Sequence, residues 1–111
     1  MIFIDFIGPR AAFDAAEKSI SQAAAAVLRT AVASVVVRRV VIEPESADVE
    51  IWVELSSEEQ LVRHGRTLAA RISDAVREAT SANVWVMFKI VPLSHAFLNG
   101  EPRGRGLPSF E

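Results

Sequence analysis

The sequence predicts an α+β domain made of two β-α-β units, with one four-stranded sheet and both helices on one face of it. Strand and helix patterns follow one another in the order β-α-β-β-α-β. The two halves have nearly equal length, and RVVIE at 39–43 matches WVMFK at 85–89 with an offset of 46 residues. We therefore expect one domain over residues 1–92, with repeats 1–46 and 47–92, and an extended C-terminal arm over 93–111.

The first unit is predicted from three stretches of sequence. Residues 2–7 (IFIDFI) are apolar apart from Asp5, and Gly8-Pro9 ends them, as expected for a buried strand. Residues 11–30 are rich in alanine and have an apolar stripe at steps of three and four, which indicates a helix. Residues 35–43 (VVVRRVVIE) are largely β-branched and predict a second strand.

The second unit repeats this plan. Residues 49–55 (VEIWVEL) alternate between apolar and larger or charged side chains, as a strand does. Ser57 followed by Gln60 is a capping box and predicts the start of a helix that runs to about Ala79. Residues 84–91 (VWVMFKIV) predict the last strand, and the glycines and prolines after it predict the extended arm.

The predicted strands carry apolar side chains on both faces, yet two helices cover only one face. An uncovered apolar sheet face needs a partner. We expect a homo-oligomer whose sheets pack around a shared interior.

Composition excludes several classes of function. With 12 Lys and Arg against 14 Asp and Glu, the net charge of -2 argues against a binder of nucleic acid or of anionic membranes. There is no cysteine, the two histidines have no neighbouring ligands, and no glycine-rich phosphate loop follows a strand, so no metal and no cofactor are predicted. No apolar run reaches the roughly 20 residues of a membrane span and no leader is recognised, which predicts a cytoplasmic protein.

Five side chains are candidates for binding or proton transfer. Arg38 and Arg39 are adjacent in a strand and point to opposite faces, so one of them faces an interior, an interface or a pocket. We favour Arg39 as an anion-binding group, and the alternative is an intersubunit salt bridge to a glutamate at position 43, 50 or 54. Arg10 at the first turn and His95 in the tail are either solvated or part of a site, and Phe97 either walls a pocket or packs in an interface. His64 is interpreted as part of a solvated helix face.

The opening MIFIDFIGPR and the closing VWVMFKIVPLSHAFLNGE resemble the two ends of proteins in the tautomerase superfamily. That family includes 4-oxalocrotonate tautomerase, macrophage migration inhibitory factor and the chloroacrylic acid dehalogenases. The resemblance implies a trimer and an isomerase activity on a small, carboxylate-bearing unsaturated keto acid or enol. It also implies that an amino-terminal proline acts as the base and that arginines matching Arg10 and Arg39 hold the carboxylate.

This sequence departs from the family at the terminus, where Met1 stands in place of the proline. We expect the Met1 amine, His95 or water to move the proton, with Arg38 and Phe97 as further substrate contacts. Where dehalogenase-like members place arginines, this chain has Ser56, Ser57 and Gln60, and it has no tyrosine, so dehalogenation is not expected.

Two alternatives stay open. The first is a non-catalytic trimeric ligand-binding or scaffold protein that has kept the same fold and lost the base. The sequence also fits a ferredoxin-like sandwich, which runs in the same β-α-β-β-α-β order and uses its sheet face as a dimer interface or ligand platform.

Overall fold

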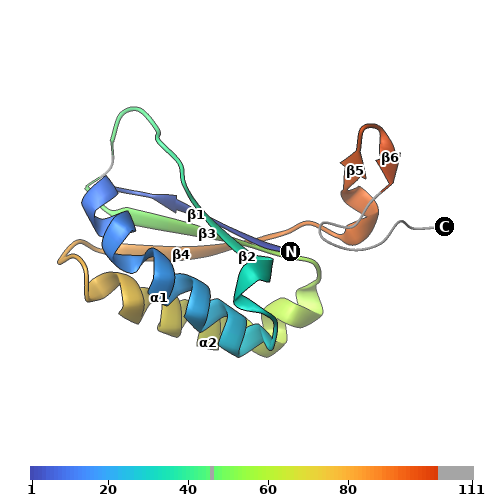
Figure 1. Ribbon diagram of the computed structural model, residues 1–111, viewed down its shortest axis with the longest axis horizontal. Helices are drawn as coiled ribbons and strands as arrows, with labels where there is room; N and C mark the ends of the chain where they lie inside the picture. Colours follow the sequence, from blue (N-terminus) through green and yellow to red (C-terminus); the bar gives the residue numbers. More distant parts are fainter. Residues whose placement is uncertain (46, 103–111) are drawn as a thin grey trace.

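The computed structural model describes residues 1–45 and 47–102 and contains one main sheet and two long helices (Figure 1). The first unit consists of β1 (Ile2–Ile7), α1 (Arg10–Leu28) and β2 (Val35–Arg39). The second consists of β3 (Val49–Leu55), α2 (Glu58–Arg77) and β4 (Val84–Ile90). Short 3-10 turns, η1 (Val32–Ser34) and η2 (Leu93–His95), precede β2 and follow β4. The chain then forms β5 (Phe97–Leu98) and β6 (Glu101–Pro102).

The main sheet has the strand order β2-β1-β3-β4. Within each unit the two strands are parallel neighbours, with Ile2 opposite Val35 and Val49 opposite Val84. The two units meet where β1 runs antiparallel to β3. This arrangement confirms the predicted fold class. It makes the ferredoxin-like alternative wrong, because that split β-α-β fold inserts another strand between the two strands of a unit.

Both helices lie side by side on one face of the sheet and enclose the core with it (Figure 1). The side chains of Ile4 and Phe6 from β1 are fully buried there, as are Ile20 from α1 and Ile72 from α2. The Phe6 and Phe13 rings meet edge to face with centroids 5.4 Å apart, which joins β1 to α1. The predicted apolar stripes of the helices therefore supply the core of the domain.

The strand β2 is shorter than its sequence predicts, because it ends at Arg39 rather than at residue 43. The Val40 N–H still donates to the Phe6 carbonyl at 2.8 Å, but the turn at Gly8-Pro9 then takes β1 into α1. Among the described residues, no strand is left to pair with 41–43. The expected match of 39–43 with 85–89 is therefore wrong in detail. The strand register instead relates Val35 to Val84.

The C-terminal stretch differs from the extended arm that we expected over 93–111. Its described part, 93–102, contains η2 and a two-stranded hairpin that stands apart from the sheet (Figure 1). The hairpin turns at Asn99 and Gly100, whose φ angles are +53° and +83°. Asparagine followed by glycine is typical of such a turn because both tolerate positive φ. The rest of the predicted arm, 103–111, lies outside the described residues.

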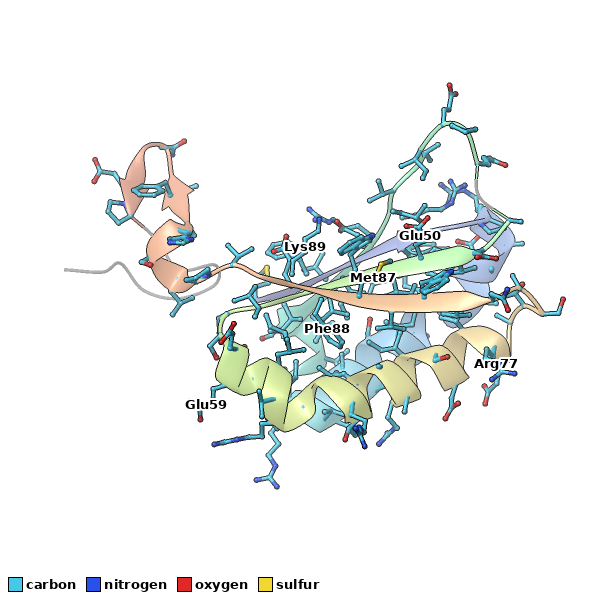
Figure 2. The ribbon with its side chains drawn as sticks, turned by 180° about the vertical axis from the view of Figure 1, so that it is seen from behind. Glu50, Glu59, Arg77, Met87, Phe88 and Lys89 are labelled. Carbon is cyan, nitrogen blue, oxygen red and sulfur yellow. The ribbon has the colours of Figure 1, made fainter. Side chains whose placement is uncertain are left out.

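The sheet face that points away from the helices carries both large apolar and charged side chains; we call it the open face. Figure 2 shows Met87, Lys89 and Glu50 on this side and Phe88 on the helix side. By the alternation and register of the strands its members are Phe3, Asp5, Ile7, Val36, Arg38, Glu50, Trp52, Glu54, Trp85, Met87 and Lys89. We expected strands that are apolar on both faces, and the open face is more polar than that.

Two cationic side chains of the open face contact neighbours within it. Arg38 donates from Nη2 to the Asp5 carboxylate at 2.8 Å and lies 4.8 Å from the centre of the Phe3 ring. The Lys89 ammonium lies 5.0 Å from the centre of the Trp52 ring. Asp5 was not among the partners predicted for the arginine pair, although its place opposite Arg38 in the parallel ladder makes it the neighbour. Within residues 1–45 and 47–102, neither long helix is apolar enough along its length to cross a membrane.

Candidate functional site

A cavity of about 210 Å³ opens where the chain begins, and we call it the Met1 cavity. Four segments meet there: the start of β1, the end of β3, the first turn of α2 and the stretch after β4. They meet because β3 runs antiparallel to β1 and parallel to β4, so the start of one strand lies beside the ends of the other two. The lining residues are Met1, Ile2, Glu54, Leu55, Ser56, Gln60, Val91, Leu93 and Ala96.

Hydrogen bonds at the start of α2 hold the polar part of this cavity in place. Ser57 is the N-cap, and its Oγ accepts from the Gln60 N–H at 3.2 Å. The Gln60 Oε1 accepts from the Ser56 N–H at 2.9 Å and from the Ser56 hydroxyl at 2.8 Å. This is the capping box that the sequence predicted, with its return bond made one residue before the N-cap. The Gln60 side chain is therefore fixed against the cavity wall.

Met1, which precedes β1, and Glu54, in β3, also line the cavity. Met1 is about half exposed at 49%, and the Glu54 side chain, at the end of β3, is half-buried. Among the described residues that line this cavity there is no arginine or lysine. The cavity thus combines Met1 with a carboxylate, a hydroxyl and an amide.

Arg39 lies at the other end of the sheet, beside a hollow of about 30 Å³, room for roughly one water molecule. Its Nε donates to the Gly8 carbonyl at 2.9 Å, which anchors the guanidinium next to the turn between β1 and α1. The hollow is also lined by Pro9 and Glu45. Arg39 is half-buried, and within the described chain it makes no ion pair.

Arg10 and Arg38 lie apart from both hollows. Arg10 begins α1, and its Nη1 is 3.8 Å from the Asp14 carboxylate, with 69% and 61% of the two side chains exposed. An exposed pair of this kind contributes little to stability. Arg38 lies on the open face with Asp5, so the two adjacent arginines do point to opposite sides of the sheet.

His95 and Phe97 lie next to the Met1 cavity in sequence but do not line it. His95 is the last residue of η2 and is exposed, whereas Leu93 in the same turn lines the cavity. Phe97 opens the hairpin and is 64% exposed, and its neighbour Ala96 lines the cavity. His64, which we interpreted as solvated, is half-buried in α2 and lines a separate groove between the helices.

A single chain does not bring the predicted site residues together. Arg39 is opposite Phe6 in the β1–β2 ladder, five residues from Met1. At about 3.3 Å per residue, that places them roughly 16 Å apart along the strand. Arg10 lies beyond the same end of β1 as Arg39. Any site that combines Met1 with either arginine needs residues from a second copy.

Three residues of the Met1 cavity were not predicted as site residues: Glu54, Ser56 and Gln60. Ser56 and Gln60 were noted only as departures from a dehalogenase pattern. Their position in the sequence could have indicated them, because a capping box that directly follows a strand brings its side chains to the end of that strand. Among residues 1–45 and 47–102, no group of three or more His, Asp or Glu side chains is arranged to hold a metal ion.

A scan against protein families finds no match, and no curated protein matches the sequence. Solved structures do match. A protein of unknown function from Vibrio cholerae O1 biovar eltor is 15% identical, with a TM-score of 0.74 over 89% of this chain and 84% of that one. A wild-type fused 4-OT, solved as an asymmetric trimer, is 15% identical, with a TM-score of 0.72 over 94% of this chain and 97% of that one.

Macrophage migration inhibitory factor from Toxoplasma gondii is also similar. It is 18% identical, with a TM-score of 0.60 over 87% of this chain and 94% of that one. At such identities the likeness is one of fold, and it extends over nearly the whole chain in each case. The chain therefore has the fold of the tautomerase superfamily.

Proposed function

We propose that this protein is a homo-oligomeric, tautomerase-like isomerase that acts on a small unsaturated keto acid or enol carrying a carboxylate. The observation that carries the proposal is the Met1 cavity. On a fold shared with 4-OT, Met1, the residue before β1, borders a cavity of about 210 Å³ that polar side chains also line.

The reaction is a proton transfer without redox change. For an enol, a base takes the hydroxyl proton and the C–O bond becomes C=O. The carbon–carbon double bond becomes single, and its terminal carbon takes a proton back from the protonated base as the new C–H bond forms. The Met1 amine is the base in this proposal, with His95 or water as the other groups that can shuttle the proton. The oxygen carries negative charge on the way, so donors near it lower the barrier.

The substrate carboxylate is assigned to Arg39 and Arg10 of a neighbouring copy. Within one chain these arginines lie at the opposite end of β1 from Met1, so a second subunit has to supply them. A fused 4-OT of the same fold is described as a trimer, which supports three copies here as well. Phe97 and Arg38 are assigned secondary contacts at the subunit boundary.

The test is ketonisation of phenylenolpyruvate and 2-hydroxymuconate by the wild type and by Arg39→Ala. We expect turnover above buffer in the wild type and a loss of at least tenfold in the variant, because a charged hydrogen bond to the substrate is removed. Arg66→Ala, an exposed change on α2, is the matched control and should leave turnover unchanged. Intact mass on the same samples identifies the terminal residue, and no turnover from a folded oligomer would contradict the proposal.

A non-catalytic ligand-binding protein of the same fold is the second candidate. The lining of the Met1 cavity favours it, because the described residues there include no histidine, arginine or lysine side chain to move a proton or to stabilise an enolate. Binding of phenylpyruvate in calorimetry, without ketonisation of its enol, would select this candidate.

A further inference from the structure

We propose that a groove between the two long helices binds a small molecule that carries two or more phosphate groups. The groove, which we call the helix groove, has a volume of about 620 Å³, and Arg29, Arg63, His64, Thr67 and Arg71 line it. None of these residues lines the Met1 cavity, so the proposal goes beyond the isomerase function and does not depend on it. The groove also stays accessible in the proposed oligomer, because the helices cover the sheet face opposite the open face (Figure 1).

Positive charge gathers in this groove although the whole chain has a net charge of -2. Three arginines line it, and its described lining residues include no aspartate or glutamate. Arg29 and Arg71 make no ion pair within the described part of the chain. Arg63 pairs with Glu59 at 2.8 Å, but the two side chains are 66% and 75% exposed. Because so exposed a pair contributes little, an anion in the groove can replace Glu59 as the partner of Arg63.

The fold brings these cations together from two helices. Arg63, Thr67 and Arg71 follow one another at intervals of four residues, so they lie along one face of α2. Arg63 and Arg71 are about 12 Å apart along the helix axis. Arg29 directly follows α1, which packs along α2. The groove therefore has two guanidinium groups on its α2 side and one on its α1 side.

Arg29 stands at a position where the backbone favours glycine. Its φ and ψ angles are +54° and +49°, the left-handed conformation in which α1 ends. Glycine is the usual residue in this conformation, because a Cβ is disfavoured at positive φ. An arginine there lowers the stability of the helix end, and a contact between its guanidinium group and a ligand accounts for its presence.

The negative end of α1 does not balance the charge of the groove. The carbonyl end of a helix acts as about half a negative elementary charge. The Ala25 carbonyl at this end already accepts from the N–H groups of Arg29 and Thr30. With this half charge, and with Glu59 beside Arg63, roughly half of the positive charge of the three arginines remains unbalanced.

The arrangement favours a small phosphorylated molecule over other anions. A phosphate group has oxygens on several sides and can accept from guanidinium groups on both helices, whereas a planar carboxylate pairs with one guanidinium fork. The spacing of Arg63 and Arg71 leaves room for more than one phosphate group. The groove has the size of a small-molecule site, and the net charge of the chain argues against nucleic acid.

Titration calorimetry of the full chain with tripolyphosphate tests the proposal. Three variants each remove one positive charge: Arg29→Gly, Arg71→Gln and Arg66→Gln. Arg66 is exposed on α2 and does not line the groove, so Arg66→Gln is the matched control. Arg29→Gly also relieves the positive φ, so its unfolding temperature should be no lower than that of the wild type. A loss of binding in this variant therefore reports the missing guanidinium group rather than a damaged fold.

We expect the wild type to bind one tripolyphosphate per chain. The dissociation constant should rise by about tenfold or more in Arg29→Gly and in Arg71→Gln, because each loses a charged hydrogen bond. It should rise by less than about threefold in Arg66→Gln, because salt screens a charge outside the groove. An equal loss in all three variants, unchanged affinity in Arg29→Gly and Arg71→Gln, or no binding at millimolar tripolyphosphate would overturn the proposal.

Two further titrations identify the class of ligand. Inorganic phosphate tests whether one phosphate group is enough, and citrate tests whether several carboxylates replace phosphate. Weaker binding of both than of tripolyphosphate supports a site for several phosphate groups. Citrate or inorganic phosphate that binds as tightly as tripolyphosphate would overturn the assigned ligand class. None of these measurements involves turnover, so their failure is distinguishable from failure of the isomerase proposal.

Discussion

Arg38 and Arg39 are adjacent in the chain, yet they have different surroundings. Arg38 pairs with Asp5 on the open face at 2.8 Å, and Arg39 donates to the Gly8 carbonyl at the end of the sheet. Strand alternation, which is visible in sequence, predicts that they diverge. Their partners are not visible, because Asp5 and Gly8 are more than 30 residues away and are brought close only by the β1–β2 ladder.

At this scale we predict that Arg38→Ala weakens the proposed oligomer. The Asp5 side chain is only 20% exposed in one chain, and an interface on the open face would bury it further. Without Arg38 its charge would be unpaired there, which is strongly destabilising. Sedimentation velocity over a dilution series should show that Arg38→Ala is half dissociated at a subunit concentration at least tenfold higher than the wild type.

The control for that experiment is Arg66→Ala, which removes an exposed arginine from the helix side. It should leave the dissociation midpoint unchanged. Equal dissociation midpoints for Arg38→Ala and the wild type would mean that the Arg38–Asp5 ion pair lies outside the subunit interface.

We also predict that Ile72→Ala lowers the free energy of unfolding by about 3 kcal/mol, as typical for a large-to-small change in a core. Ile72 is fully buried between α2 and the sheet. Val62→Ala on the same helix, where the side chain is 87% exposed, should change it by less than about 0.5 kcal/mol. Urea unfolding at one fixed protein concentration measures the free energy of unfolding of both variants. Equal losses in the two variants would contradict the burial of Ile72 in the core.

At the scale of elements, the helices and central strands follow their sequence signals closely. The Ser57 N-cap and the bounds of β1 and β3 coincide with the predictions. The errors fall at β2 and in the C-terminal stretch. Residues 41–43 have strong strand propensity but no partner strand in the described part of the chain, because β1 turns away at Gly8. Propensity is local, whereas a strand needs a neighbour.

Substitution by alanine should have opposite effects at two glycines, because their side-chain surroundings differ. A Cβ on Gly65, inside α2, would lie 2.8 Å from Leu61 Cδ1, the end of a flexible, half-buried side chain that can move. A Cβ on Gly8 would lie 2.9 Å from Phe6 Cε1 and 3.2 Å from Val49 Cγ2, and both of those side chains are fully buried. We expect Gly65→Ala to raise the free energy of unfolding by about 0.5 kcal/mol through helix propensity.

By contrast, Gly8→Ala should lower that free energy by about 1–3 kcal/mol, because the buried ring has no space to yield. Urea unfolding of the two variants beside the wild type provides the comparison. A destabilised Gly65→Ala protein would mean that Leu61 is held more rigidly than its exposure indicates.

At the scale of the whole molecule, the open face and the hairpin each carry large apolar side chains that are exposed in one chain. Trp85 is 57% exposed on the open face, and Phe97 and Leu98 in the hairpin are 64% and 58% exposed. Exposed apolar groups of this size are typical of interaction sites. They agree with the oligomer proposed from the separation of Met1 and Arg39.

We therefore predict that the protein forms a trimer of 12.1 kDa chains, about 36 kDa in total. Light scattering after size exclusion, and native mass spectrometry, both measure this mass directly. A mass of one chain at micromolar concentration would contradict both the trimer and the shared site. A dimer would keep a shared site but reject the trimeric arrangement.

The sequence by itself determined the order of elements, the helix stripes, the capping box and the division into two units, because periodicity and caps are local properties. The tertiary structure decided where the chemistry lies. The antiparallel pairing of β1 with β3 places Met1 beside Glu54, Ser56 and Gln60, and the parallel pairing with β2 places Arg39 at the far end. These neighbours depend on which strands pair and in which direction, and no local pattern in the chain specifies that.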